Sequence, residues 1–193
     1  IWKIATQGAL GLNRGMAAVD ALKFLNAVLP DAVPARFEEL AEPLCVTATD
    51  YHAAALVPFT SGDLRPAIAA SIAIPAVFRP VQIGGRVFVD GGVIDNLPLR
   101  HLPEVDLVVA VDVLADLPRV PGAVPGQVEA AKASLRMMMV RQIEQAIAAD
   151  PPDLLVRPPV RVGAARGLWQ VAETLDRAEA VRAPVRVALE RMI

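Results

Sequence analysis

The feature that most constrains the fold is the run at residues 106–113, Asp-Leu-Val-Val-Ala-Val-Asp-Val, which is apolar at almost every position. A strand with one solvated face alternates polar and apolar side chains, whereas a strand covered on both faces of a parallel sheet does not. The run therefore predicts a buried parallel strand. Further strands are expected at residues 44–49, 54–59, 81–83, 86–89 and 153–156, with Gly84-Gly85 as a hairpin turn.

Helices are expected between and after these strands. Residues 16–29 place apolar side chains at helical spacing, and residues 64–72 predict a helix with Asp63 as its N-cap, the carboxylate accepting from first-turn N–H groups. Two longer helices are predicted at residues 128–149 and 168–192. Strands separated by helices predict an α/β fold with a mostly parallel sheet, and 193 residues suffice for one domain.

The composition argues against several classes of function. A formal net charge of −2 and the lack of a basic run give no reason to expect a nucleic-acid partner. The single cysteine, Cys45, precludes an internal disulfide, and its apolar neighbours predict that it packs in the core. The two histidines and one cysteine have no metal-ligand spacing, and no glycine-rich phosphate loop occurs, so neither a metal nor a cofactor is expected.

The location of the protein is also constrained. No uncharged apolar stretch approaches the ~20 residues that a membrane-spanning helix needs. The residues from Ile1 onward lack the basic start and apolar segment of a signal peptide. With no disulfide framework, these features predict a cytoplasmic protein.

One segment stands out as a candidate site. At residues 88–92 an apolar strand runs directly into Asp90, Gly91 and Gly92. Catalytic groups gather at strand ends in α/β domains, and glycines let the backbone turn sharply beside a carboxylate. From this segment alone, a catalytic carboxylate and a turn aspartate that caps its own loop both stay open. Asp95 and Asn96 are expected to satisfy backbone groups in the same loop.

The surrounding motifs narrow the choice. Residues 71–80 read Ser-x-Ala-x-Pro-x-x-Phe-x-Pro, residues 48–50 read Ala-Thr-Asp, residues 90–92 read Asp-Gly-Gly and residues 96–98 read Asn-x-Pro. This ordered set resembles the patatin-like phospholipase family. The resemblance is dense over residues 44–113 and looser over residues 114–193. It implies that residues 1–193 are the C-terminal portion of a single patatin-like hydrolase domain with three α/β/α layers.

The resemblance also implies a chemistry. In the family, a serine in Gly-x-Ser-x-Gly attacks an ester carbonyl, and the aspartate of Asp-Gly-Gly activates that serine. Asp90 matches this aspartate, and Gly91 and Gly92 shape its loop. The implied substrate is a lipid or other acyl ester, with peripheral membrane contact and no cofactor. Such a dyad is physically reasonable because a serine hydroxyl is a weak nucleophile without an adjacent base.

The sequence departs from the family in one respect. It contains no Gly-x-Ser-x-Gly and no glycine-rich oxyanion loop, so the chain is expected to begin after its own catalytic serine. Ser71 matches the structural serine of the family and is not expected to be a nucleophile. His101 and His52 have no counterpart in the motifs and are expected at the surface or the rim of the site. Asp112 is expected to cap a strand end.

Two hypotheses remain open. The first is a lipid acyl hydrolase in which Asp90 is the general base and the serine lies upstream. Ile74, Val77 and Phe78 could then line an acyl-chain pocket, although they could equally belong to the core. The second is a truncated, non-catalytic homologue that serves as a binding or interaction module. The sequence does not define the oligomeric state.

Overall fold

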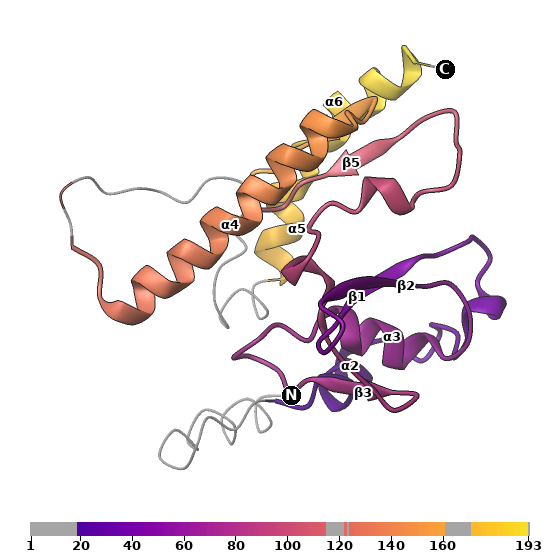
Figure 1. Ribbon diagram of the computed structural model, residues 1–193. Coiled ribbons are helices and arrows are strands. Elements are labelled where there is room, and N and C mark those ends of the chain that lie inside the picture. The colour runs from indigo at the N-terminus through magenta and orange to yellow at the C-terminus, as the bar shows by residue number, and fades with distance from the viewer. Residues whose placement is uncertain (1–18, 115–121, 123, 161–170, 193) are drawn as a thin grey trace. The chain divides into compact units, whose positions relative to one another are not determined.

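The computed structural model describes residues 19–114, 122, 124–160 and 171–192 of the chain (Figure 1). The chain divides into two compact units, Ile1–Asn96 and Leu97–Ile193. Both units contain helices and strands, which confirms a mixed α/β composition. Within the described residues, no helix is long and apolar enough to cross a membrane.

The first unit contains a four-stranded sheet in the order β2-β1-β4-β3, made of β1 (Val46–Asp50), β2 (Ala55–Phe59), β3 (Val81–Ile83) and β4 (Arg86–Asp90). Every neighbouring pair is antiparallel, so the prediction of a mostly parallel sheet is wrong for this sheet. Short connections explain two of the three antiparallel pairs. Residues 51–54 join β1 to β2 and Gly84-Gly85 join β3 to β4, whereas parallel neighbours need a crossover of about a dozen residues or more.

Helix α3 (Leu64–Ser71) packs against the sheet of the first unit. Ala48 of β1, Ala70 of α3 and Phe88 of β4 form one buried cluster. Burial of a ring such as that of Phe88 contributes about 1.5–3 kcal/mol to folding. Helix α2 (Ala21–Val28) packs on α3 in a second cluster that includes Phe78. The packing anchors β4, the strand that ends at Asp90.

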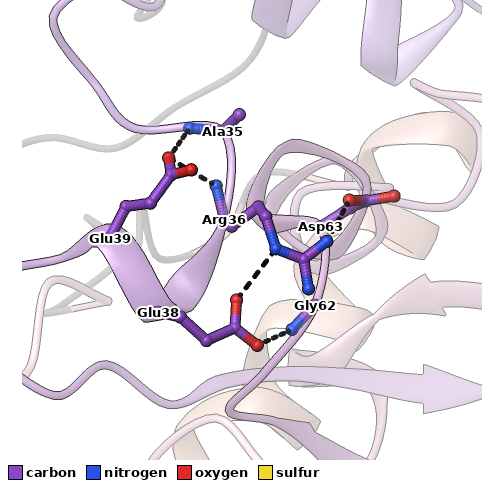
Figure 2. Close-up of polar contacts among 6 residues, drawn as sticks. All are labelled: Ala35, Arg36, Glu38, Glu39, Gly62 and Asp63. Atoms are coloured by element: carbon purple, nitrogen blue, oxygen red, sulfur yellow. Dashed lines mark hydrogen bonds and ion pairs between the residues drawn. The ribbon is translucent and has the colours of Figure 1, made fainter.

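Helices α2 and α3 begin differently, although an aspartate precedes each. The Asp20 carboxylate accepts a hydrogen bond from the Lys23 N–H at 2.9 Å and so caps α2. Asp63 occupies the N-cap position of α3 but makes no capping bond, so the predicted cap interaction is wrong. Its carboxylate instead lies 3.3 Å from Nη1 of Arg36, whose Nε also pairs with Glu38 at 3.2 Å (Figure 2).

This polar cluster surrounds the short 3-10 helix η1 (Phe37–Glu39). The Glu38 carboxylate accepts from the Gly62 N–H at 2.9 Å, and Glu39 reaches back to the Ala35 N–H at 3.1 Å (Figure 2). Phe37, on the same turn, is buried against Leu64. The cluster therefore ties η1 to the start of α3.

The second unit pairs β5 (Val109–Val111) with β6 (Leu154–Val156) in parallel, as the sequence predicts for these two strands. Helix α4 (Gln127–Ala149) contributes Ile143 to a cluster with Ala110 of β5 and with Leu97. Only Ala110 of β5 is buried, because Val109 and Val111 remain 40% and 54% exposed. The prediction that both faces of this strand are buried is therefore wrong for the described residues.

Three further expectations need correction or fall outside the described residues. The single helix predicted at residues 168–192 is two helices, α5 (Val171–Glu179) and α6 (Arg182–Glu190), with residues 168–170 not described. Pro184 explains the break, because it has no N–H for a helical bond to the preceding turn. Cys45 is exposed and lies just before β1, so its predicted core position is wrong. The proline and glycine residues at 118–126 predict a loop, and most of this segment lies outside the described residues.

Candidate functional site

Asp90 is the last residue of β4, and its backbone is held on three sides. Its N–H donates to the Ala73 carbonyl at 3.1 Å, which ties the strand end to the residues that follow α3. Its carbonyl accepts from the Thr49 hydroxyl at 3.0 Å. In the sheet, Asp90 is paired with Ala48 of β1. These contacts fix the position from which the side chain leaves the sheet.

The Asp90 carboxylate has one strong partner. Oδ1 accepts a hydrogen bond from the Gly92 N–H at 2.7 Å, and Asp90 is thereby the N-cap of the 3-10 helix η2 (Gly91–Val93). The described residues offer no hydrogen bond to the other oxygen, Oδ2. Burial raises the pKa of the Asp90 carboxyl above its ordinary value of 3.8, and the bond from Gly92 opposes that shift.

Gly91 and Gly92 are required because neighbouring atoms lie too close for a Cβ, and not because the backbone has a positive φ. A Cβ at Gly91 would lie 2.6 Å from the Thr47 carbonyl oxygen and 2.9 Å from the Thr47 hydroxyl. A Cβ at Gly92 would collide with the Asn96 side-chain oxygen and approach Asp90 Oδ1 to 3.1 Å. The first glycine lets the loop pass against β1, and the second leaves room beside the carboxylate.

The loop after Asp90 closes on itself. The Asn96 side-chain amide donates to the Gly92 carbonyl at 2.7 Å, as the sequence predicts for this residue. The Asp95 N–H donates to the Gly91 carbonyl at 3.0 Å, and Asp95 is 8% exposed. The turn that presents the Asp90 carboxylate is thus a short, internally bonded structure.

The other sequence candidates belong to other elements of the chain. His52 is exposed in the turn after β1, where its N–H donates to Asp50 at 2.9 Å. Ser71 ends α3 and makes no hydrogen bond with Asp90. Within the second unit, Asp112 accepts from the Leu114 N–H and pairs with Arg157 at 3.0 Å, which agrees with a capped strand end. His101 ends the 3-10 helix η3 (Leu99–His101) of that unit.

Metal chemistry finds no obvious ligands in the described part of the chain. Across residues 19–114, 122, 124–160 and 171–192, no three His, Cys, Asp or Glu side chains gather as a metal site would require. The groups near Asp90 are a threonine hydroxyl, backbone amides and an asparagine amide.

A pocket of about 360 Å³ lies beside the Asp90 turn. The sequence predicts only part of its lining. Phe78 lines it, as one of three proposed acyl-pocket residues, whereas Ile74 and Val77 do not. Two unexpected lining residues are Ala54 and Ala76, with φ of 50° and 67°. No composition or periodicity signal marks an alanine in the left-handed region.

Comparison with known protein families identifies the family of this chain. The sequence model of the patatin-like phospholipase family matches residues 5–103, which include the whole Asp90 turn. The chain belongs to the patatin-like phospholipase family. This confirms the resemblance drawn from the Ser-x-Ala-x-Pro and Asp-Gly-Gly motifs.

Curated relatives agree with that assignment. An uncharacterized NTE family protein of Mycobacterium bovis is 43% identical to this chain over 93 residues, and two proteins of the same description from Mycobacterium tuberculosis match equally. The aligned region is 47% of this chain but only 26% of each relative. The chain therefore matches about a quarter of the length of these mycobacterial relatives.

Proposed function

We propose that the protein to which this chain belongs hydrolyses acyl esters of lipids, with Asp90 as the general base of a Ser-Asp dyad. The observation that supports this most is the Asp90 carboxylate itself. One oxygen is held by the Gly92 N–H at 2.7 Å, while the described residues leave Oδ2 without a hydrogen bond. Membership of the patatin-like phospholipase family makes an acyl ester the natural substrate class.

The proposed chemistry is acyl transfer to serine and then to water. Asp90 Oδ2 would take the serine hydroxyl proton as the serine oxygen attacks the ester carbonyl. The proton would pass to the departing alcohol oxygen as the ester bond breaks. Asp90 would then take a proton from a water molecule as the water oxygen attacks the acyl-serine carbonyl. That proton would return to the serine oxygen as its bond to the acyl group breaks and the fatty acid leaves. A raised pKa suits this role, because a base works best when its pKa approaches the working pH.

The nucleophile is a separate part of the proposal. The printed sequence contains no Gly-x-Ser-x-Gly, so a serine outside it would have to attack the ester. We infer that residues 1–193 are the C-terminal portion of one three-layer patatin-like domain, and that the remainder supplies the serine and the oxyanion donors. Peripheral contact with a lipid surface would bring the ester to Asp90.

The alternative is a non-catalytic homologue that acts as a binding or interaction module. The observation that favours it is the same absence of Gly-x-Ser-x-Gly from the printed sequence. Under this alternative, the Asp90 turn would be a structural remnant whose carboxylate only caps η2. The two proposals differ in whether the native gene product hydrolyses an ester.

The test is hydrolysis of p-nitrophenyl acyl esters and phospholipid vesicles by the protein made from its complete native gene. Asp90→Asn should lower kcat by about 10²–10⁴-fold, the usual contribution of a general base. Asp63→Asn is the matched control, because that carboxylate belongs to the same unit and its side chain is 72% exposed. Full activity in Asp90→Asn, or no hydrolysis by the unmutated protein, would refute the dyad.

A further inference from the structure

A buried hydroxyl, that of Thr49, holds the backbone of Asp90. Thr49 lies on β1, is 3% exposed and pairs in the sheet with Val89, the residue before Asp90. Its Oγ1 donates to the Asp90 carbonyl at 3.0 Å and lies 3.5 Å from the carbonyl oxygen of Gly91. The hydroxyl therefore meets the chain where β4 ends and η2 begins.

The bond from Thr49 acts one peptide away from the bond that holds the carboxylate. The Asp90 carbonyl belongs to the peptide between Asp90 and Gly91, and the N–H that donates to Asp90 Oδ1 at 2.7 Å belongs to Gly92. A peptide unit is planar, so fixing its carbonyl sets the orientation of the whole unit. The Ala73 carbonyl accepts the Asp90 N–H at 3.1 Å. Both peptide units that flank the Asp90 Cα are therefore anchored by residues outside β4.

The shape of the site does not by itself require a hydroxyl at Thr49. Valine matches threonine in its branching and nearly in its size, and it is equally favourable in a strand. A buried hydroxyl, by contrast, is costly unless it makes a hydrogen bond. The acceptors near the Thr49 hydroxyl are the carbonyls of Asp90 and Gly91. The hydroxyl therefore serves the turn that presents the Asp90 carboxylate.

We propose that Thr49 is a positioning residue for the candidate base, an inference that rests on the proposed hydrolase function. Its hydroxyl holds the peptide after Asp90 in the orientation in which the Gly92 N–H reaches Oδ1, and this leaves Oδ2 for the serine hydroxyl. Thr49 itself takes no proton and acts through the carboxylate. Loss of its hydroxyl should slow the chemical step, because misplacing a reacting group by about 1 Å costs about 100-fold in rate.

The experiment measures kcat for p-nitrophenyl acetate with the protein made from its complete native gene. Thr49→Val removes the hydroxyl but keeps the shape, and it should lower kcat by about 10–100-fold. Thr49→Ser keeps the hydroxyl and should retain most of the activity. Thr60→Val makes the same substitution at an exposed position after β2 and should leave kcat unchanged. Equal kcat in folded Thr49→Val and in the unmutated protein would overturn the inference.

A double variant separates a positioning role from a general effect on the fold. If Thr49 acts through Asp90, Thr49→Val should cost little further activity in an Asp90→Asn background, because the group that it positions has been replaced. If the two losses multiply in full, Thr49 acts independently of Asp90 and the inference fails. Thermal unfolding shows whether each variant is folded, and Thr49→Ala, which also lacks the hydroxyl, takes the place of a valine variant that does not fold.

The Gly92 amide proton reports the geometry of the turn without a substrate. Because this N–H donates to Asp90 Oδ1, its NMR chemical shift should follow the ionisation of Asp90. We expect Thr49→Val to reduce that pH-dependent change and Thr49→Ser to keep it. If the change is reduced but the unmutated protein hydrolyses no ester, Thr49 positions the carboxylate and the proposed function fails. If esters are hydrolysed and Thr49→Val alters neither kcat nor the Gly92 titration, the hydroxyl serves only the backbone and the inference fails.

Discussion

Asp50 ends β1 and Asp90 ends β4, and in the antiparallel register of these neighbouring strands Asp50 pairs with Phe88 and Asp90 pairs with Ala48. Asp50 accepts hydrogen bonds at 2.9 Å from the N–H groups of His52 and Ala53, and Arg86 donates to its other oxygen at 2.6 Å. Among the described residues, the Asp90 carboxylate accepts one hydrogen bond, from the Gly92 N–H. Within that part of the chain, both carboxylate oxygens of Asp50 are hydrogen-bonded, whereas one of Asp90 is.

The difference appears in the pKa of each group. The Ala53 N–H and the Arg86 side chain hold the pKa of Asp50 below its ordinary value of 3.8. Burial raises the pKa of Asp90 above 3.8. A carboxylate that accepts several hydrogen bonds holds its proton less tightly, whereas burial favours the protonated form. Two aspartates that each end a strand of the same sheet therefore differ in pKa because their partners and their burial differ.

The largest expected effect on stability comes from a change at Gly91, in the turn that follows Asp90. In Gly91→Ala, the new methyl group meets the Thr47 carbonyl oxygen at 2.6 Å, and a backbone atom inside a sheet cannot move away easily. We expect a loss of about 1–3 kcal/mol in the free energy of unfolding, measured by urea denaturation. Replacing the Thr47 side chain should not restore stability, since the closest atom belongs to the backbone.

Gly92→Ala provides the contrasting case in the same turn. Its methyl group meets the side-chain oxygen of Asn96, which can rotate or be removed. We therefore expect a smaller loss of stability than in Gly91→Ala, and partial rescue in the double variant Gly92→Ala/Asn96→Ala. Equal destabilisation by the two alanines would contradict the view that the sheet backbone confines Gly91.

The next effect concerns Asp50. Asp50→Asn removes the ion pair with Arg86 and one of the charge-assisted acceptors for the turn, so the urea midpoint should fall. Because the pKa of Asp50 is lowered in the folded state, its contribution is present above pH 3.8 and is lost as the pH falls through the lower folded value. The difference between unmutated protein and Asp50→Asn should therefore shrink on acidification. A constant difference would argue that the charge of Asp50 is unimportant.

Asp90→Asn should change the stability in the opposite direction from Asp50→Asn, and by a smaller amount. Because the pKa of Asp90 is raised in the folded state, this group destabilises the fold least below pH 3.8, where it is protonated. The protein loses stability as the pH rises through the pKa of folded Asp90. Asparagine keeps an oxygen for the Gly92 N–H and never ionises, so the variant should become the more stable protein as the pH approaches neutrality. Urea unfolding at acidic and neutral pH measures this difference. A variant less stable at neutral pH would mean that the ionised carboxylate has a stabilising partner.

The sequence predicted local features better than strand direction and side-chain environment. The hairpin at Gly84-Gly85 was predictable because the turn itself requires positive φ, found at +56° and +78°. The position of Asp90 at a strand end was likewise predictable from the apolar run before it. The antiparallel pairing of β1 with β4 was not, because an apolar run does not reveal the direction of a strand that is distant in the chain. Ala54 and Ala76 were missed because the composition of a loop does not report its backbone angles.

A change at Asp63 should have the smallest effect on stability. It tests the prediction that Asp63 caps α3, which was wrong. An aspartate before an apolar helix predicts a cap, as Asp20 provides for α2, but the Asp63 carboxylate pairs with Arg36 at 3.3 Å instead. An exposed pair of this type contributes about 0.2–1 kcal/mol, with less at high salt, whereas loss of a true cap costs about 0.5–2 kcal/mol. Asp63→Ala should therefore have a smaller effect than Asp20→Ala on the urea midpoint.

Asparagine separates the two explanations at Asp63, because it can cap a helix but cannot form an ion pair. If Arg36 is the partner that matters, Asp63→Asn and Asp63→Ala should lower stability equally, and added salt should remove most of the loss. If Asp63→Asn keeps the stability that Asp63→Ala loses, the side chain caps α3 in solution. Asp63 would then join Asp50 and Asp90 as an aspartate whose carboxylate accepts a backbone N–H of the following turn.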